Sequence, residues 1–427
     1  MDKIRAAAEN KERRWLKMEI QDLRARQIFD SRGVPTLEVK AVLSDGSEGF
    51  GSAPSGASTG SHEAKELRDG GEAYGGRGVS RAIDNVNGPI HNALIGMDAA
   101  DQARVDERLG ELDGTADKSK LGGNALIAAS WAVADAAARG ARTELYRWLG
   151  GAQARQLPCP MFNVINGGRH ADNNLEIQEF MFVPSGADSF HEAMRMGTEC
   201  YQSLKRLLRD AGLSTAVGDE GGFAPNLKRD EEALEWMTRA IEAAGWKPGE
   251  DVCLALDCAA AEWADGETYR QPKSGAQFRR GELIEFYDAL SQRFPLISIE
   301  DPLGEEDFEG FREITDALGG DLMIVGDDLF TTNAERLFRG AALGAANAVL
   351  VKPNQIGTVS ETLETVQLAR KSAYSVVVSH RSGETLSTAI ADLAVAVSAE
   401  YIKAGAPCRG ERMAKYNRLL EIEEQLF

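Results

Sequence analysis

The sequence is poor in cysteine and has no long apolar run, and both absences exclude classes of protein. Five cysteines in 427 residues, an odd number with no Cys-x-x-Cys pair, favour reduced thiols over a disulfide framework. No run of about 18 apolar residues occurs, so no membrane-spanning segment is predicted. The first 18 residues lack the apolar core of a secretory signal, and we interpret them as a charged, fraying helix. A cytoplasmic protein is therefore expected.

The chain is also short of positive charge. It has 48 Lys and Arg against 67 Asp and Glu, a formal net charge of −19. Nucleic acids and anionic membrane surfaces are bound through basic patches, so neither is an expected partner. If the substrate is itself a small anion, cations gathered at the site must overcome the repulsion of the whole molecule.

The pattern of apolar residues divides the chain in two. Residues 19–44 alternate as strands do, and residues 80–149 are largely helical. Gly150-Gly151 and the nearby prolines Pro158 and Pro160 then mark a boundary. Beyond this boundary strands and helices alternate, which is typical of an α/β domain with parallel strands.

We therefore predict an α/β protein of three parts. An N-terminal extension covers residues 1–18, an α+β domain covers 19–150, and a larger domain of alternating strands and helices covers 151–427. A chain of this length has enough residues for about two domains, each with a sizeable core.

In the larger domain, short apolar runs repeatedly end in a charged or ionisable side chain. The terminal residues are Asp257, Glu300, Asp327, Lys352, His380 and Lys403. Most of the gaps between them are close to the roughly 30 residues that one βα unit of an eightfold barrel needs. Catalytic groups of such barrels lie at the C-terminal ends of the strands, so the pattern predicts an active site rich in charge.

Asp257, Glu300 and Asp327 would repel one another in one cavity unless a cation lay between them. All-oxygen ligation of this kind suits Mg²⁺, although each acid alone could simply cap a following helix. Lys352 is a candidate general base, because burial and neighbouring cations would lower its pKa toward 7–8. The alternative is a lysine that only forms an ion pair with Asp327 or Glu300.

Four weaker signals lie in loops. The segment His380-Arg381-Ser382-Gly383 offers a guanidinium, a hydroxyl and backbone amides, which together suit a phosphate. The Gly/Ser-rich segment 51–60 is either a functional loop or an ordinary linker. Residues 163–179 and the glycine-flanked Glu220 present further acids and a histidine, which in isolation would be interpreted as surface loop.

Taken together these segments resemble the enolase family, from about residue 20 to residue 426. The motifs that carry the resemblance are Asp30-Ser-Arg-Gly33, Pro54-Ser-Gly-Ala-Ser-Thr-Gly60, Asn166-Gly-Gly168, Gln178-Glu179-Phe180, Gly218-Asp-Glu-Gly-Gly222, Ser298-Ile-Glu-Asp-Pro302, Gly326-Asp-Asp-Leu329, Asn354-Gln-Ile-Gly357, Ser379-His-Arg-Ser-Gly-Glu-Thr385 and Ala414-Lys-Tyr-Asn417. As a set they are specific for that family.

The resemblance implies a C-terminal enolase-type β/α barrel with an N-terminal α+β capping domain. It also implies a carbon–oxygen lyase of the phosphopyruvate hydratase type, which takes the C2 proton and C3 hydroxide from 2-phosphoglycerate to give phosphoenolpyruvate, a step of glycolysis. By position Lys352 resembles the base, Glu220 the acid and Glu179 its partner. A homodimer or higher homo-oligomer is the family's usual state.

The resemblance further implies two Mg²⁺ ions in each active site. Asp257, Glu300 and Asp327 match the ligands of the first ion, and Ser58 matches a ligand of the second. The positions that match contacts with the small phosphorylated substrate are His170, Gln178, His380, Arg381, Ser382 and Lys403.

The chain departs from the family where an acidic pair usually follows Ser-Gly-Glu-Thr, since Leu386-Ser387 stands there. We predict from this change that the substrate pocket tolerates a further anionic group. An alternative function is therefore that of a phosphonate-pathway paralogue of the carboxyphosphonoenolpyruvate synthase type, which would join the enolpyruvate of 2-phosphoglycerate to a phosphonate. A second alternative is a non-catalytic binding protein with the same fold.

Overall fold

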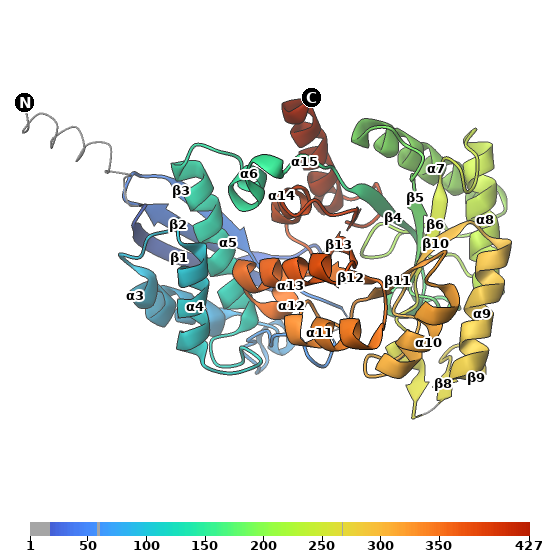
Figure 1. The fold of residues 1–427 in the computed structure, drawn as a ribbon, viewed down its shortest axis with the longest axis horizontal. Coiled ribbons are helices and arrows are strands. Elements are labelled where there is room, and N and C mark those ends of the chain that lie inside the picture. Colours follow the sequence, from blue (N-terminus) through green and yellow to red (C-terminus); the bar gives the residue numbers. More distant parts are fainter. Residues whose placement is uncertain (1–17, 58–59, 267) are drawn as a thin grey trace, which may run out of the picture.

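The structure is a computed structural model that describes residues 18–57, 60–266 and 268–427. Two lobes lie side by side, an N-terminal domain in blue and teal and a barrel in green to red (Figure 1). Of the predicted N-terminal extension only Met18 lies within the described residues, and the predicted metal ligand Ser58 lies outside them.

The N-terminal domain is an antiparallel sheet covered by helices, as predicted. Its strands follow one another in the order β1 (Ile20–Phe29), β2 (Pro35–Leu43) and β3 (Glu48–Ser52). The helices are α2 (Ser80–Asn85), α3 (His91–Leu94), α4 (Gln102–Asp113), α5 (Gly123–Gly140) and α6 (Leu145–Gly150).

The alanine-rich helix α5 is buried almost all round and packs against β2 and β3. Small residues on both surfaces allow this close approach. A Cβ added at Gly51 would lie 2.2 Å from the carbonyl oxygen of Ala128, and one at Gly49 would lie 2.0 Å from the amide nitrogen of Ala136. The helix can therefore lie directly on the backbone of β3.

The C-terminal domain is a closed barrel of eight strands, which confirms the predicted fold class. In barrel order the strands are β10 (Leu296–Glu300), β11 (Met323–Gly326), β12 (Ala348–Val351), β13 (Ser375–Ser379), β14 (Tyr401–Lys403), β4 (Cys159–Asn166), β5 (Glu179–Val183) and β6 (Cys253–Asp257). All six apolar runs with charged ends form strands of this barrel. A separate small sheet contains β7 (Ala264–Asp265), β8 (Thr268–Arg270) and β9 (Gln277–Arg279).

The expectation of parallel strands is wrong for β5, which runs antiparallel to both β4 and β6. A parallel neighbour requires a crossover connection of a dozen or more residues, usually a helix. The connection over residues 167–178 contains only a single short turn of helix, so the chain returns directly along β4. As a result Glu179, the first residue of β5, pairs in register with Asp257, the last residue of β6.

Helices cover the outside of the barrel. They are α7 (Phe190–Asp210), α8 (Asp230–Ala243), α9 (Arg280–Arg293), α10 (Phe308–Leu318), α11 (Ala334–Leu343), α12 (Pro353–Ile356), α13 (Val359–Lys371), α14 (Ala389–Ala396) and α15 (Gly410–Leu426). Within the described part of the chain, none of the helices combines the length and apolar character needed to cross a membrane.

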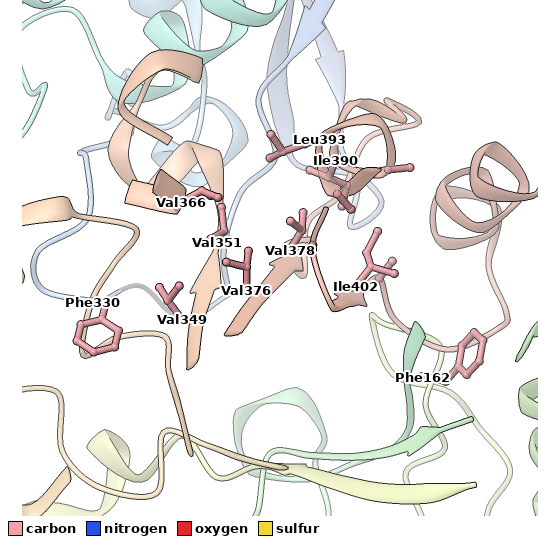
Figure 2. Close-up of a cluster of buried hydrophobic side chains, with 14 of the residues drawn as sticks. Phe162, Phe330, Val349, Val351, Val366, Val376, Val378, Ile390, Leu393 and Ile402 are labelled. Carbon is pink, nitrogen blue, oxygen red and sulfur yellow. The ribbon is translucent and has the colours of Figure 1, made fainter. Parts of the chain in front are cut away.

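Alternation along each strand separates the core from the site. In β12, Val349 and Val351 face outward and pack with residues of the covering helices, such as Val366 of α13 (Figure 2). Leu350 belongs to a separate apolar cluster inside the barrel. The next inward-facing residue after Leu350 is Lys352, so the interior becomes charged where the strand ends. This alternation brings the predicted charged side chains together at the end of the barrel, next to the apolar cluster that fills its interior.

Candidate active site

The predicted site residues meet in one small cavity at the C-terminal ends of the barrel strands. The cavity has a volume of about 20 Å³ and is lined by His170, Gln178, Glu179, Glu220, Asp257, Ala259, Asp301, Asp327, Asp328, Lys352, Ser379, His380, Arg381, Ser382 and Lys403. Glu300 lies beside it, bonded to Lys403. Because about one water molecule fills such a volume, the ion pairs must move apart to admit a ligand.

Lys403 lies among the acids that were predicted to hold a metal. Its Nζ is 3.0 Å from Asp257 Oδ2 and from Glu179 Oε2, and 2.8 Å from Glu300 Oε2. Burial, followed by the neighbouring Asp257 carboxylate, raises the pKa of Glu300 well above its usual value even though Lys403 opposes this. The acids of this cluster offer the all-oxygen donor set that a divalent cation prefers. Among the described residues, however, Asp257, Glu300 and Asp327 do not form one of the groups whose ligand atoms are close enough to hold one ion in this arrangement.

Among the described residues there are two separate groups of side chains, each with its ligand atoms close enough together to hold an ion. One contains Asp301, Asp327 and Asp328, and the other contains His170 and two glutamates. Asp301 was missed by the sequence analysis, although its position directly after Glu300 was a signal. Its two carboxylate oxygens accept the backbone N–H groups of Asp327 and Asp328, at 2.9 and 2.8 Å, and so orient the end of β11.

Lys352 forms a close ion pair with Asp327. Burial acts to lower the pKa of Lys352, but the neighbouring carboxylates, Asp327 first and then Glu300, together raise that pKa above its usual value. The lowered pKa expected for a general base is therefore not found in this arrangement. The second Asp327 oxygen, Oδ1, accepts a hydrogen bond of 2.9 Å from Gln355 Nε2.

Two glutamates and a histidine form the acidic side of the cavity. His170 Nδ1 lies 3.4 Å from Glu179 Oε1 and 3.8 Å from Glu220 Oε1. Burial acts to lower the pKa of His170, but these two carboxylates raise it. Burial and the Glu220 charge raise the pKa of Glu179, so the two acids do not ionise with equal ease. Asn163 Nδ2, which the sequence analysis missed, donates to Glu220 Oε2 over 2.9 Å.

The predicted phosphate segment is joined to the N-terminal domain. Arg381 Nη1 lies 2.7 Å from Glu63 Oε2, and both side chains are buried. Glu63 also accepts the backbone N–H of Gly60 at 2.9 Å, so it holds the end of the Gly/Ser-rich loop. Ser382 Oγ lies 3.5 Å from His170 Nε2. The sequence analysis missed Glu63, although it follows the Gly/Ser-rich segment 51–60 by three residues, because its partner Arg381 is far away in the sequence.

Leu386 and Ser387 lie outside the cavity around Lys352. The Leu386 side chain is 73% exposed and lines a separate groove of about 850 Å³, together with Phe29, Phe50 and Ser387. Neither residue lines the cavity around Lys352. Ser387 does line a small neighbouring pocket together with Arg381 of the phosphate segment. That the pair lets the substrate pocket tolerate a further anionic group stays a prediction.

Comparison with protein families agrees with the geometry. Residues 20–149 match the model described as the enolase N-terminal domain. Residues 154–427 match the model described as the enolase C-terminal TIM barrel domain. The two matches together extend over nearly the whole chain, and they include every described residue of the cavity. The chain therefore belongs to the enolase family.

Proposed function

We propose that this enzyme removes the C2 proton and the C3 hydroxide of 2-phosphoglycerate to form phosphoenolpyruvate. The observation that carries the proposal is the meeting of Lys352, the Glu179–Glu220 pair and Arg381 around one buried cavity beside a surplus of carboxylates. Candidates for the base, the acid, the phosphate grip and the cation site are thus gathered in one place, which supports a catalytic protein over a purely structural relative of the family.

Lys352 is the proposed general base. It can accept a proton only if it first loses one, and the Asp327 carboxylate at its side opposes that loss. If Asp327 served as a metal ligand, its carboxylate would hold the Lys352 proton less strongly, and burial and Arg381 would then favour the neutral amine. Asp327 thus couples the protonation of the base to occupancy of the cation site.

Glu220 is the proposed acid, with Glu179 as its partner. Both are buried, and both lie near the histidine His170 that can share their proton. A pair of acids with unequal proton affinities can hold one proton and present it to a leaving hydroxide. Gln178 Nε2 donates to Asp257 Oδ2 over 3.3 Å, which places its amide beside the substrate position.

Asp257, Glu300 and Asp327 are the proposed ligands of one Mg²⁺, and Ser58 remains the predicted ligand of a second. Bound Mg²⁺ would stabilise the negative charge that develops on the substrate carboxylate when the C2 proton leaves. Arg381 and Ser382 are proposed to bind the phosphate, and His170, His380 and Lys403 to contact the rest of the substrate. Lys403 must first give up some of its three carboxylate partners.

The test is incubation of the purified protein with 2-phosphoglycerate and Mg²⁺, with and without phosphonoformate. Ultraviolet absorbance and phosphorus NMR should show phosphoenolpyruvate in both samples, and excess EDTA should stop its formation. A carbon–oxygen-linked adduct formed only with the phosphonate would instead support the phosphonate-pathway paralogue. No product in any sample would refute the proposal and favour a binding protein.

The cell compartment and the assembly state are also proposals. All five cysteines are free thiols, which supports a reducing compartment such as the cytoplasm. Phe29, Phe50 and Leu386 expose apolar surface around one groove, which supports a homo-oligomer in which a second copy covers this face. Sedimentation equilibrium would measure the mass, and a monomer of 46.1 kDa would refute the oligomer.

A further inference from the structure

The guanidinium of Arg412 lies behind the candidate active site and is fully buried. Its Nη1 is 2.6 Å from His380 Nδ1 and 2.6 Å from the carbonyl oxygen of Arg381. Its Nη2 lies 2.6 Å from the carbonyl oxygen of Ser382 and 3.0 Å from that of Asp219. One side chain of α15 therefore bonds to the phosphate segment, to a histidine and to the turn that carries the acid.

The contact with His380 decides which ring nitrogen carries the proton. A guanidinium has five N–H donors and no acceptor, and it stays protonated in proteins. His380 Nδ1 must therefore be the acceptor in this contact, because an N–H there would point at another N–H over 2.6 Å. The proton of a neutral His380 then lies on Nε2, which is 3.3 Å from Glu220 Oε2.

The charges around His380 keep it neutral. Burial lowers its pKa to about 4, with the Arg412 guanidinium acting in the same direction, although the carboxylates of Glu220 and Glu384 oppose them. The opposing carboxylates are partly balanced, since Lys415 lies 2.8 Å from Glu384 and His170 lies near Glu220. The carboxylate nearest Arg412 itself is that of Glu411, 3.4 Å from Nε.

We propose that Arg412 is a positioning residue that fixes His380 as the neutral Nε2–H tautomer and joins the phosphate segment to the Glu220 turn. His380 would then act as a directed hydrogen-bond donor toward Glu220 or the substrate and would not carry a charge. The tautomer rests on the geometry alone. Its effect on turnover rests on the proposed function.

The tautomer is measured directly by ¹⁵N NMR on protein labelled at histidine. The chain has five histidines, so His380→Asn identifies the His380 signals. We expect a pyridine-type Nδ1 and a pyrrole-type Nε2 that persist from pH 5.5 to pH 8.5. A pyrrole-type Nδ1, or an imidazolium at pH 6, in the unsubstituted protein would overturn the proposal.

Substitutions separate positioning from simple packing. Arg412→Met removes every donor, and we expect His380 of the folded variant to lose its fixed Nε2–H tautomer and to titrate at a higher pH than in the unsubstituted protein, because burial still lowers its pKa but Arg412 no longer adds to that effect. Arg412→Lys keeps a charged N–H donor that cannot act as an acceptor, and it should restore the Nε2–H tautomer. Lys415→Met is the matched control, because it removes another buried cation of α15 whose partners are Glu384 and Thr385. An unchanged His380 spectrum in a folded Arg412→Met protein would contradict the proposal.

Turnover provides a second readout. Loss of a residue that orients a ligand-contacting side chain typically costs about 10- to 100-fold. We expect Arg412→Met to lower kcat by that factor, with Arg412→Lys recovering most of it. If the unsubstituted protein shows the expected tautomer but no turnover of 2-phosphoglycerate, the proposed function fails and the inference about Arg412 and the tautomer stands. Equal losses of kcat in the Met and Lys variants would contradict the positioning role.

Discussion

Lys352 and Glu220 are both buried, and their surroundings favour the charged form of each: the pKa of Lys352 is raised and that of Glu220 is lowered well below its usual value, although burial acts in the opposite direction on both. Asp327 favours the protonated amine of Lys352, whereas Asn163 and His380 donate to the carboxylate of Glu220 or lie beside it. At the scale of single residues the site is thus a set of ion pairs, and these pairs must break before the side chains can bind a ligand. Removing either residue should therefore interrupt a different half of the reaction.

Lys352→Ala should abolish both exchange of the C2 proton with solvent and elimination. General acid–base groups typically contribute about 10²- to 10⁴-fold, and we expect a loss of kcat in that range. Glu220→Gln should lose elimination to a similar extent but keep the exchange, because the base is intact. Proton NMR in deuterium oxide with 2-phosphoglycerate measures the exchange, and circular dichroism checks the fold. Loss of exchange in Glu220→Gln would contradict the division of roles.

Glu63→Gln should weaken the grip on the phosphate. The variant keeps the shape of the side chain but removes the charge that holds Arg381 and the end of the Gly/Ser-rich loop. We expect KM for 2-phosphoglycerate to rise about tenfold, which corresponds to roughly 1.4 kcal/mol, with kcat changed less. Steady-state kinetics measure both constants. An unchanged KM would mean that Arg381 needs no support from the N-terminal domain.

At the scale of elements, the close contact of α5 with β3 decides which residues the sheet can carry. Gly51→Ala should destabilise the protein by about 1–3 kcal/mol, because the new Cβ would overlap the backbone of α5 at Ala128. Gly110→Ala in α4 is the matched control, since no atom lies within 4 Å of the added Cβ, and there the helix should gain about 1 kcal/mol. Urea unfolding measures both changes. Similar effects of the two substitutions would contradict the packing argument.

Asp230 joins the start of α8 to the loop before β5 by accepting the backbone N–H groups of Glu176 and Ile177. Burial raises its pKa from 3.8 to about 7. The folded protein therefore holds this proton more tightly than the unfolded chain does, so its contribution to stability is complete below about pH 4 and is lost as the pH rises through 7. At about 1.36 kcal/mol per pH unit the contribution is at most roughly 4 kcal/mol.

Asp230→Asn should therefore flatten the dependence of stability on pH. The amide oxygen still accepts both backbone N–H groups but cannot ionise. We expect the Tm of the unsubstituted protein to fall more between pH 5 and pH 8 than that of the variant, as measured by calorimetry. Parallel curves for the two proteins would show that Asp230 does not titrate in this range.

The sequence predicted the elements better than their directions. Alternation and charged strand ends identified the barrel strands, because a side chain's direction follows from its position in the strand. The reversal of β5 was not predicted, since it depends on the absence of a crossover helix and not on the residues of the strand. Glu63, Asn163 and Arg412 were missed for a related reason. Each of them acts through a contact with a residue that is far away in the sequence. A pattern of neighbouring residues cannot predict such a contact.

At the scale of the whole molecule, the two domains share one site and one boundary. Besides the Glu63–Arg381 pair, Asp106 of α4 accepts hydrogen bonds from the backbone and hydroxyl of Ser360 in α13. Lys118 also lies 2.8 Å from Glu361. These contacts between the domains, buried or partly buried, lead us to expect that the capping domain and the barrel unfold together and not in separate steps.

The groove beside Leu386 provides a test at the same scale. The double substitution Leu386→Glu with Ser387→Asp should leave kcat and KM for 2-phosphoglycerate within about twofold, because neither side chain lines the active-site cavity. It should weaken the proposed homo-oligomer, since two carboxylates would be buried at the face that a second copy is proposed to cover. Kinetics and sedimentation on the same sample measure both. A changed substrate preference would support the prediction that Leu386 and Ser387 affect which substrates the pocket accepts.

The reversed strand β5 limits which barrel scaffolds could carry a copy of this set of site residues. In an ordinary eightfold barrel every strand arrives at the active rim with its last residue, so a designer would graft functional groups onto strand termini alone. Here Glu179 comes to that rim with the first residue of β5, opposite Asp257. A copy of the site built on an all-parallel scaffold would leave this acid at the far end of its strand. The position of Glu179 in the acid pair therefore depends on the direction of its strand as well as on the residue itself.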